Sequence, residues 1–295
     1  MSVHSARIWI EAARPKTLGA GIVPVVMATA MAFRAGSVDG LSALCALLGA
    51  MLIQIGTNLA NDYADFVKGA DTSDRVGPVR ATQAGLLSPR AMRRAAALVF
   101  FLACAPGAYI VWRGGWPFAV IGIVSILCGA LYTAGPFPLG YIGLADVFVL
   151  VFFGPVALAG TYWLHVQHVS GAAVVAGLAP GLLSVALLTV NNLRDIEEDR
   201  RAGKRSLAVR FGAGFARGEY GVCIFTAAFL VPMYLAWSTG NHGAFLASVA
   251  ALALGIRPVR VVLMGAAGRD LNRVLAQTGR LLWAYGAAFS AGWLL

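Results

Sequence analysis

Charged residues are scarce in this sequence, and their scarcity argues against a soluble protein. Only 12% of the 295 residues are charged and 59% are hydrophobic, with a mean hydropathy of +0.76. Soluble domains are about 25% charged and roughly 45–50% apolar. A soluble core could not hide this much apolar surface, so lipid must surround much of the chain. The composition therefore predicts an all-α integral membrane protein.

Cysteine and histidine are also rare, which argues against sites built from them. The four cysteines lie inside apolar stretches, at spacings that fit neither a zinc site nor a disulfide framework. Three of the four histidines fall on the outer side of the membrane in the topology derived below, and the fourth is in the N-terminal tail. None of these residues is expected to bind a metal.

Long apolar runs, by contrast, are abundant. Crossing a bilayer takes about 20 residues, and nine runs approach or exceed that length. We therefore expect a bundle of about nine transmembrane helices. No linker or low-complexity tail interrupts the runs, so residues 1–295 are expected to form a single domain. The runs span residues 17–34, 40–60, 93–112, 116–135, 144–164, 171–191, 219–238, 242–264 and 278–295.

Basic residues lie almost entirely on one side of these runs. If the N-terminus is cytoplasmic, the inner segments and their flanks hold 21 of the 23 lysines and arginines, and only Arg34 and Arg113 fall outside. The positive-inside rule then predicts a cytoplasmic N-terminus and, after nine spans, an outer C-terminus. We expect a multi-pass protein of the bacterial cytoplasmic (inner) membrane. Anionic lipid head groups explain the net charge of +10 without nucleic acid.

Most of the acidic residues gather at two places. Nine of the 13 lie in or beside two segments that follow the second and sixth apolar runs. These segments are NLANDYADFVKGAD (58–71) and NNLRDIEEDRRAGKR (191–205). Their positions four runs apart suggest a repeated bundle with a site between its halves.

Within each segment, carboxylates stand three or four residues apart and therefore on one side of a helix. Asp62 and Asp65 form the first pair, and Asp195 and Asp199 form the second. Stacked carboxylates repel one another by roughly a few tenths of a kcal/mol, which is tolerated where a cation bridges them. Mg²⁺ takes hard oxygen ligands, usually one or two carboxylates together with substrate phosphates. These four aspartates are thus the candidate metal ligands and catalytic residues.

Basic side chains stand beside the acidic ones. Lys68, Arg75 and Arg80 follow the first pair, and Lys204 and Arg205 follow the second. Arginine and lysine bind phosphoryl oxygens. Acidic metal ligands interleaved with basic residues at a membrane face therefore indicate a site for a lipid diphosphate. Glu197 and Glu198 lie off the stripe of the second aspartate pair and are expected to face water.

Asp146 stands apart, near the start of the fifth run, after YTAGPFPLGYIGLAD (132–146). A carboxylate costs roughly 2.5–3.5 kcal/mol at mid-membrane and less near a helix end, so it is a functional candidate. Pro136 and Pro138 in the preceding loop predict irregular backbone, which is tolerated only where it lines protein or a cavity.

The first acidic segment resembles a motif of the UbiA superfamily of intramembrane aromatic prenyltransferases. That motif is commonly N-D-x-x-D-x-x-x-D, and Asn61, Asp62 and Asp65 match it. Gly69 stands where the motif has its last aspartate, and Asp71 comes two residues later.

The second family motif, D-x-x-x-D, is matched by Asp195 and Asp199. The late aspartate of the first motif resembles the branch that prenylates 1,4-dihydroxy-2-naphthoate in menaquinone synthesis. Four segments extend the resemblance to that branch over nearly the whole chain. They are RPKTL (14–18), NDYADFVKGADT (61–72), YTAGPFPLGYIGLADVFVLVFFGPVA (132–157) and NNLRDIEEDRRAGKRSLAVRFG (191–212).

The resemblance implies a helical bundle with a central cavity that opens sideways to lipid. A polyprenyl diphosphate would bind through Mg²⁺ to the four aspartates, and the naphthoate ring would attack the cation-like allylic carbon with loss of CO₂. An apolar cavity would shield that carbon from water. Asp146 is a candidate to orient a ring hydroxyl or to accept a proton. The candidate substrate-binding residues are Asn58, Asn61, Arg80, Lys68, Lys204, Arg14, Tyr132 and Asn192.

Other functions stay open at this point. Relatives in the superfamily attach prenyl groups to 4-hydroxybenzoate, homogentisate, or haem and chlorophyll precursors through the same metal motifs. A cation-coupled transporter would more often hold its aspartates near the membrane midplane. A lipid-alcohol phosphotransferase would carry D-G-x-x-A-R, which this sequence lacks. The sequence leaves the prenyl length and the oligomeric state open.

Overall fold

The computed structural model describes residues 3–69, 76–77, 79–135 and 138–295, and these residues are almost entirely helical, with no strand among them. Asp71, Arg75 and Pro136, which were discussed above, lie outside the described residues. The first half comprises α1 (Val3–Ala13), η1 (Pro15–Thr17), α2 (Gly19–Arg34), α3 (Gly40–Val67), α4 (Pro89–Gly114), α5 (Trp116–Ala130), α6 (Leu139–Ile142), α7 (Ala145–Val151) and η2 (Phe152–Val156). The second comprises α8 (Ala157–Val166), α9 (Gly171–Arg194), α10 (Ile196–Arg201), α11 (Leu207–Phe225), η3 (Thr226–Leu230), α12 (Val231–Thr239), α13 (His242–Leu263), η4 (Gly268–Asp270) and α14 (Leu271–Leu294).

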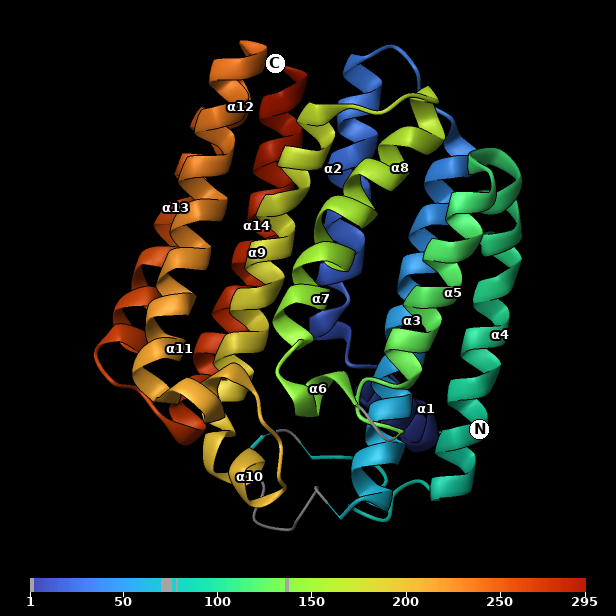
Figure 1. The fold of residues 1–295 in the computed structure, drawn as a ribbon, viewed down its shortest axis with the longest axis vertical. Coiled ribbons are helices and arrows are strands. Elements are labelled where there is room, and N and C mark those ends of the chain that lie inside the picture. The colour runs from blue at the N-terminus through green and yellow to red at the C-terminus, as the bar shows by residue number, and fades with distance from the viewer. Residues whose placement is uncertain (1–2, 70–75, 78, 136–137) are drawn as a thin grey trace.

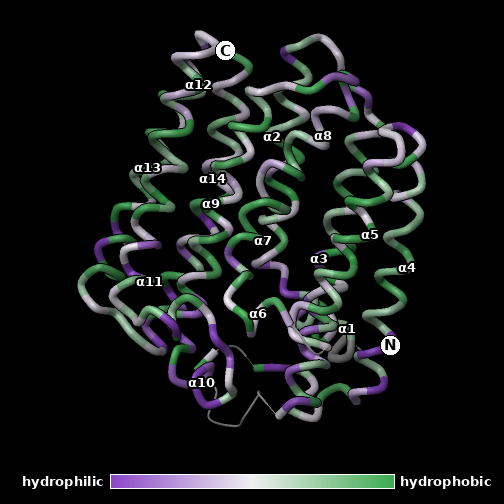
Figure 2. Tube along the Cα trace, viewed as in Figure 1, coloured by the Kyte–Doolittle hydropathy of each residue, from purple (hydrophilic) through white to green (hydrophobic). Residues whose placement is uncertain are grey.

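The long helices run side by side as a bundle, with the short helices α1, α6 and α10 gathered toward one end (Figure 1). Helix α1 and the C-terminus lie at opposite ends of the bundle. Hydrophilic residues concentrate near α10 and the adjoining end of α11, whereas the middle of the bundle is mainly hydrophobic (Figure 2). We call the end that carries α1 and α10 the polar end.

All nine apolar runs fall in helices, but the count of nine spans is not confirmed. Six helical segments of the described chain are long and apolar enough to cross a membrane, and a seventh is added if α1 and α2, bent by 55°, form one broken span. Helix α5 has only 15 residues, fewer than the roughly 20 that a span needs. Helix α14 has 24 residues, but its Asn272 and Arg280 line the main cavity, so it need not be uniformly apolar.

Polar side chains cap the N-termini of most of the long helices. A side-chain oxygen accepts a hydrogen bond from a backbone N–H in the first turn at Asp39 of α3, Ser88 of α4, Ser170 of α9, Ser206 of α11 and Asn241 of α13. These bonds satisfy donors that have no partner within the helix. The caps explain why each helix starts where its apolar run meets a Ser, Asp or Asn.

Helix α9 lies at the centre of the bundle and is the most buried of the candidate spans. Its glycines allow it to approach the helix kink at η2 closely. A Cβ on Gly177 would stand 2.7 Å from the Pro155 Cα, and a Cβ on Gly181 would stand 2.5 Å from the Leu150 carbonyl oxygen. Small residues allow such close packing in membranes, where lipid is as apolar as the side chains. Large side chains such as Phe101 and Trp237 are 72% and 80% exposed, as expected of a surface that faces lipid.

Candidate active site

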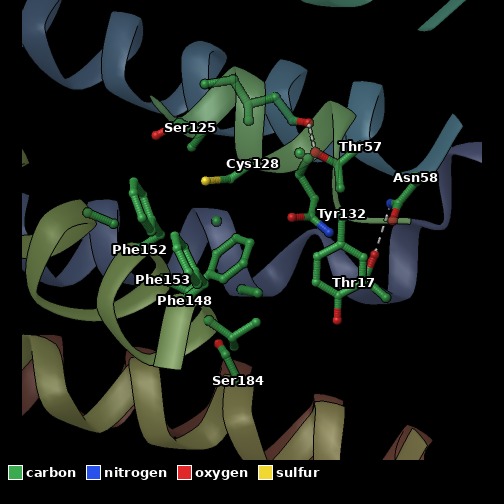
Figure 3. Close-up of a pocket in the computed structure, with 18 of the residues that line it drawn as sticks. Thr17, Thr57, Asn58, Ser125, Cys128, Tyr132, Phe148, Phe152, Phe153 and Ser184 are labelled. Atoms are coloured by element: carbon green, nitrogen blue, oxygen red, sulfur yellow. Dashed lines mark hydrogen bonds between the residues drawn. The ribbon is translucent and has the colours of Figure 1, made fainter. Parts of the chain in front are cut away.

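A cavity of about 1100 Å³ opens between the helices and extends from the polar end into the bundle. Helices α2, α3, α4, α5, α9 and α14 contribute to its wall, together with the segment from α7 to α8. The inner part is apolar: Phe148, Phe152 and Phe153 lie together across the cavity from Thr57 and Asn58 (Figure 3). The polar lining comes largely from the two acidic segments and from the arginines and lysines near them.

The last turns of α3 position the first acidic segment. Asp65 lines the cavity and is 2% exposed. The Arg80 guanidinium donates to Asp65 Oδ2 at 3.1 Å, and the Lys204 ammonium lies 3.7 Å from Oδ1. Asp65 thus carries a buried negative charge with a basic group on each side.

Asp62 is buried one turn earlier on α3 but is held differently. Its Oδ2 accepts from the Ala81 N–H and its Oδ1 accepts from the Thr82 N–H, each at 3.2 Å. The carboxylate therefore fixes the turn that carries Arg80. Asp62 is not among the described residues that line the cavity.

The second acidic segment contains a break that the spacing of its aspartates did not show. Helix α9 ends at Arg194, Asp195 adopts a non-helical conformation, and α10 starts at Ile196. The prediction that Glu198 faces water, which assumed one continuous helix, was wrong. Glu198 lines the cavity, and its Oε1 accepts from the Val76 N–H at 2.7 Å. Glu197 is exposed, as expected, and pairs with Arg200 at 2.8 Å.

Arg194, one of the basic residues of the inner segments, anchors this break. Its guanidinium donates twice to Asp195, both at 2.6 Å, and also to Asn191 Oδ1 at 2.7 Å and Asn272 Oδ1 at 3.0 Å. The side chain is only 1% exposed. Arg194 thereby fixes Asp195 in the cavity wall and ties the end of α9 to the start of α14.

Lys204 brings the two acidic segments together. Its ammonium lies 3.6 Å from Asp199 Oδ1 as well as 3.7 Å from Asp65 Oδ1. Burial raises the pKa of Asp199 to about 6 even though Lys204 lowers it, and the charges of Asp195 and Asp65 add to the increase. The site therefore concentrates carboxylates in a place where their charge is costly.

The ring of Tyr141, in α6, contacts two of the basic groups. Lys68 Nζ lies 4.6 Å and Lys204 Nζ 5.3 Å from the centre of its ring, distances typical of cation–π contacts. The Tyr141 carbonyl also accepts from the Arg205 N–H at 3.0 Å. Lys68 itself is not among the described lining residues of the cavity. Apart from the GPFPLGY run, no pattern in the sequence predicted this contact.

Tyr132 and the two asparagines of α3 occupy the wall between the polar and apolar parts. The Tyr132 hydroxyl points into the open part of the cavity (Figure 3), and burial raises the pKa of Tyr132 above its usual range, with Asp146 adding to the effect. The phenol therefore stays protonated as a donor. Asn61 Oδ1 accepts from Thr133, and Asn58 donates to Thr17 and to the Ala13 carbonyl.

The remaining predicted residues divide into two groups. Arg14 and Asn192 line the cavity, and their role in substrate binding stays a prediction. Asp146 is 6% exposed, and neither of its carboxylate oxygens has a hydrogen-bond partner in the described structure. It is not among the described lining residues, and its role stays a prediction.

The donor set fits a magnesium ion. The described residues contain no preformed group of three or more His, Cys, Asp or Glu ligands, but Mg²⁺ needs only one or two carboxylates besides substrate phosphates and water. Asp65 Oδ1 is buried without a hydrogen bond, and Asp199 shares the same lysine. Two hard carboxylates that lack a full set of donors are suitable ligands for a small divalent cation.

The model of the UbiA prenyltransferase family matches residues 22–283 of the chain. The chain is 32% identical over 299 residues to the 1,4-dihydroxy-2-naphthoate octaprenyltransferase of Haemophilus influenzae, covering 98% of this chain and 96% of that protein. It is 36% identical over 285 residues to the protein of the same name from Mycobacterium tuberculosis (95% of each chain), and 41% identical over 228 residues to that of Escherichia coli K12 (75% and 74%).

Solved structures show the same fold at low sequence identity. A UbiA homolog from Archaeoglobus fulgidus superposes with a TM-score of 0.69 at 15% identity, covering 98% of this chain and all of that one. The same homolog bound to DMAPP and Mg²⁺ gives a TM-score of 0.67 at 15% identity, over 96% and 99% of the two chains.

Proposed function

The chain belongs to the UbiA prenyltransferase family and is a multi-pass membrane prenyltransferase. We propose that it prenylates 1,4-dihydroxy-2-naphthoate in menaquinone biosynthesis. The donor is a polyprenyl diphosphate, and the naphthoate loses CO₂ to give a demethylmenaquinol. The observation that carries the proposal is the convergence of Asp65 and Asp199 on Lys204 at the polar end of an otherwise apolar cavity.

The choice of acceptor rests on the relatives. Proteins named 1,4-dihydroxy-2-naphthoate octaprenyltransferase from three organisms are 32–41% identical to this chain over three quarters of its length or more. The alternative within the family is another aromatic acceptor such as 4-hydroxybenzoate, which would use the same acidic segments. A cation-coupled transporter is disfavoured because the aspartates lie near one end of the bundle, beside basic partners.

In this proposal, residues of the acidic segments bind the metal ion and their basic neighbours bind the diphosphate. Asp65, Asp195 and Asp199, with the amide oxygens of Asn61 and Asn192, would hold Mg²⁺, which supplies positive charge to the departing diphosphate. Asp62 belongs to the same family motif, and a direct ligand role for it stays a prediction. Its bonds to the Ala81 and Thr82 amides hold the turn of Arg80 in place.

Arg80, Lys204 and Arg14 line the cavity, and in this proposal they bind the phosphoryl oxygens. Their charges stabilise the diphosphate more as its negative charge grows than in the intact donor, which is what lowers the barrier. The C–O bond of the donor breaks and leaves its electron pair on the diphosphate. The ring carbon that bears the carboxylate then bonds to the allylic carbon, and the C–CO₂ bond returns its electron pair to the ring.

The apolar part of the cavity protects this chemistry. Phe148, Phe152 and Phe153 and the small residues of α4 and α5 exclude water from the cation-like carbon. Tyr132 presents a protonated hydroxyl at the boundary and donates to an oxygen of the bound aromatic ring. Asp146 lies outside the cavity wall, so we assign it no direct contact with the acceptor.

The proposed placement in the cell follows from the charges. Residues 1–295 act as one transmembrane domain in the bacterial cytoplasmic membrane, with the polar end toward the cytoplasm. The N-terminus is then cytoplasmic and the C-terminus outside. The support is the concentration of lysine and arginine in the segments of that end.

The experiment uses the purified protein in detergent or in membranes with Mg²⁺ and a long-chain prenyl diphosphate. It offers 1,4-dihydroxy-2-naphthoate and 4-hydroxybenzoate in parallel and identifies products by mass. We expect a product only from the naphthoate, carrying the prenyl group and lacking the carboxylate. A product from 4-hydroxybenzoate alone would reject the acceptor and keep the diphosphate site. No product from either, with binding of the diphosphate insensitive to EDTA, would reject the site itself.

A further inference from the structure

A second, smaller cleft of about 460 Å³ lies where α13 and α14 meet at the polar end of the bundle. Arg257 from α13, Arg269 and Asp270 from η4, and Arg273 from the first turn of α14 line it. The prenyltransferase chemistry derived above uses none of these four residues.

The charge of this cleft is strongly unbalanced. Three guanidinium groups face a single carboxylate, and none of the three guanidinium groups forms an ion pair or a hydrogen bond within the described part of the chain. Their side chains are exposed. The N-terminus of α14 adds the positive end of a 24-residue helix to the same place. A cleft with this charge is complementary to an anion, and the arginine fork fits phosphate oxygens.

The surroundings of the cleft favour a lipid over a free anion. On α13, Leu254 and Ile256 are 54% and 64% exposed, and Leu263 and Met264 at the end of that helix are 55% and 72% exposed. These side chains give the half of α13 that carries Arg257 an exposed apolar surface. A free phosphate would use only the charges, whereas a phospholipid would use both features. Basic pockets between membrane helices at the cytoplasmic surface bind acidic head groups in this way.

We propose that the cleft between α13 and α14 binds the phosphate head group of an acidic phospholipid, with the acyl chains along the exposed face of α13. The site is distinct from the prenyl diphosphate site, but Asn272 lines both cavities. Asn272 accepts from Arg194 and donates to the Val76 carbonyl at 3.2 Å. A lipid held beside it stabilises the start of α14 against the second acidic segment.

The test compares two triple variants that remove the same charge from the same end of the bundle. R257Q/R269Q/R273Q removes the arginines of the cleft. R90Q/R93Q/R94Q removes three exposed arginines at the start of α4 and is the matched control. Each protein, purified in detergent, is titrated with short-chain phosphatidylglycerol, and the rise in thermal unfolding temperature gives the affinity. Phosphatidylcholine and inorganic phosphate are titrated in parallel.

We expect phosphatidylglycerol to stabilise the wild type and the α4 variant equally. Its affinity for the cleft variant should fall by at least about tenfold, since each basic residue near a membrane surface adds to the attraction for acidic lipids. Equal stabilisation of all three proteins would overturn the proposal. So would equal stabilisation by inorganic phosphate, which would identify a free anion, or by phosphatidylcholine, which would remove the need for charge. If the triple variant does not fold, R269Q alone should weaken binding and R269K should weaken it less. None of these readouts requires turnover.

Discussion

The ammonium of Lys204 lies 3.6 Å from a carboxylate oxygen of Asp199. The same ammonium lies 3.7 Å from Asp65, which comes from a helix more than 130 residues earlier in the chain. One flexible cation thus occupies the space between the two acidic segments. A compact ammonium on a long side chain can turn from these carboxylates to phosphate oxygens when a diphosphate and its metal arrive.

Replacing Lys204 with glutamine should weaken binding of the prenyl diphosphate. Hydrogen bonds to charged groups contribute roughly 1.5–3 kcal/mol, so we expect the KM for the donor to rise roughly tenfold to a hundredfold with little change in the KM for the acceptor. Steady-state kinetics with each substrate varied in turn measure both. Arg201→Gln, at an exposed position of α10, is the control. A larger effect on the acceptor than on the donor would contradict this role.

Tyr141 should act as a positioning residue for the two lysines above its ring. Removing the ring in Tyr141→Leu forfeits cation–π contacts of about 0.5–2 kcal/mol, so the KM for the prenyl diphosphate should rise roughly twofold to thirtyfold. Tyr141→Phe keeps the ring and should behave like the wild type. An equal rise in this KM in both variants would assign the effect to the hydroxyl and contradict the positioning role of the ring.

Arg194 should be required for the stability of the polar end. Arg194→Met leaves Asp195 buried without its partner, and breaking a buried pair in this way costs about 3–5 kcal/mol. Denaturant unfolding in detergent should show the loss, and prenyl transfer should fall with it. The exposed pair of Arg200 and Glu197 provides the control, because Arg200→Ala should cost less than about 1 kcal/mol. Similar losses in the two variants would refute the anchor role.

Gly177 should be intolerant of any side chain. A Cβ there would stand 2.7 Å from the Pro155 Cα, which cannot move without shifting the break between α7 and α8. Gly177→Ala should therefore destabilise the protein by about 1–3 kcal/mol. Gly218→Ala meets open space in α11 and should be neutral or stabilising, by up to about 1 kcal/mol. Thermal unfolding of both variants compares them directly, and equal effects would contradict the packing.

The sequence predicted what depends on hydrophobicity and on local spacing. Each apolar run falls in a helix because lipid leaves the backbone no other way to pair its polar groups. The acidic segments come together because both follow helices that end on the same side of the membrane. The pairing of Asp65 with Asp199 through Lys204 is a consequence of that topology.

The remainder depends on contacts that spacing cannot show. Glu198 lines the cavity just after Asp195, where the backbone departs from helical geometry, and the spacing of the aspartates does not reveal that departure. In the sequence, Arg194 is one of many arginines in the inner segments. Only its hydrogen bonds to Asp195, Asn191 and Asn272 distinguish it from the others. Asp146 satisfied the rule that buried charge is functional, yet it lies outside the described cavity wall.

The most direct test of the account is a double-mutant cycle on Asp65 and Asp199, measured as Mg²⁺-dependent binding of a prenyl diphosphate to the purified protein. We predict that Asp65→Asn and Asp199→Asn each weaken binding at least about tenfold. The double variant should lose less affinity than the product of the two single effects, because both residues serve one site. Glu197→Gln should bind the prenyl diphosphate like the wild type. Binding that is insensitive to Mg²⁺, or effects of the two substitutions that multiply as if independent, would contradict a single site formed by the two acidic segments.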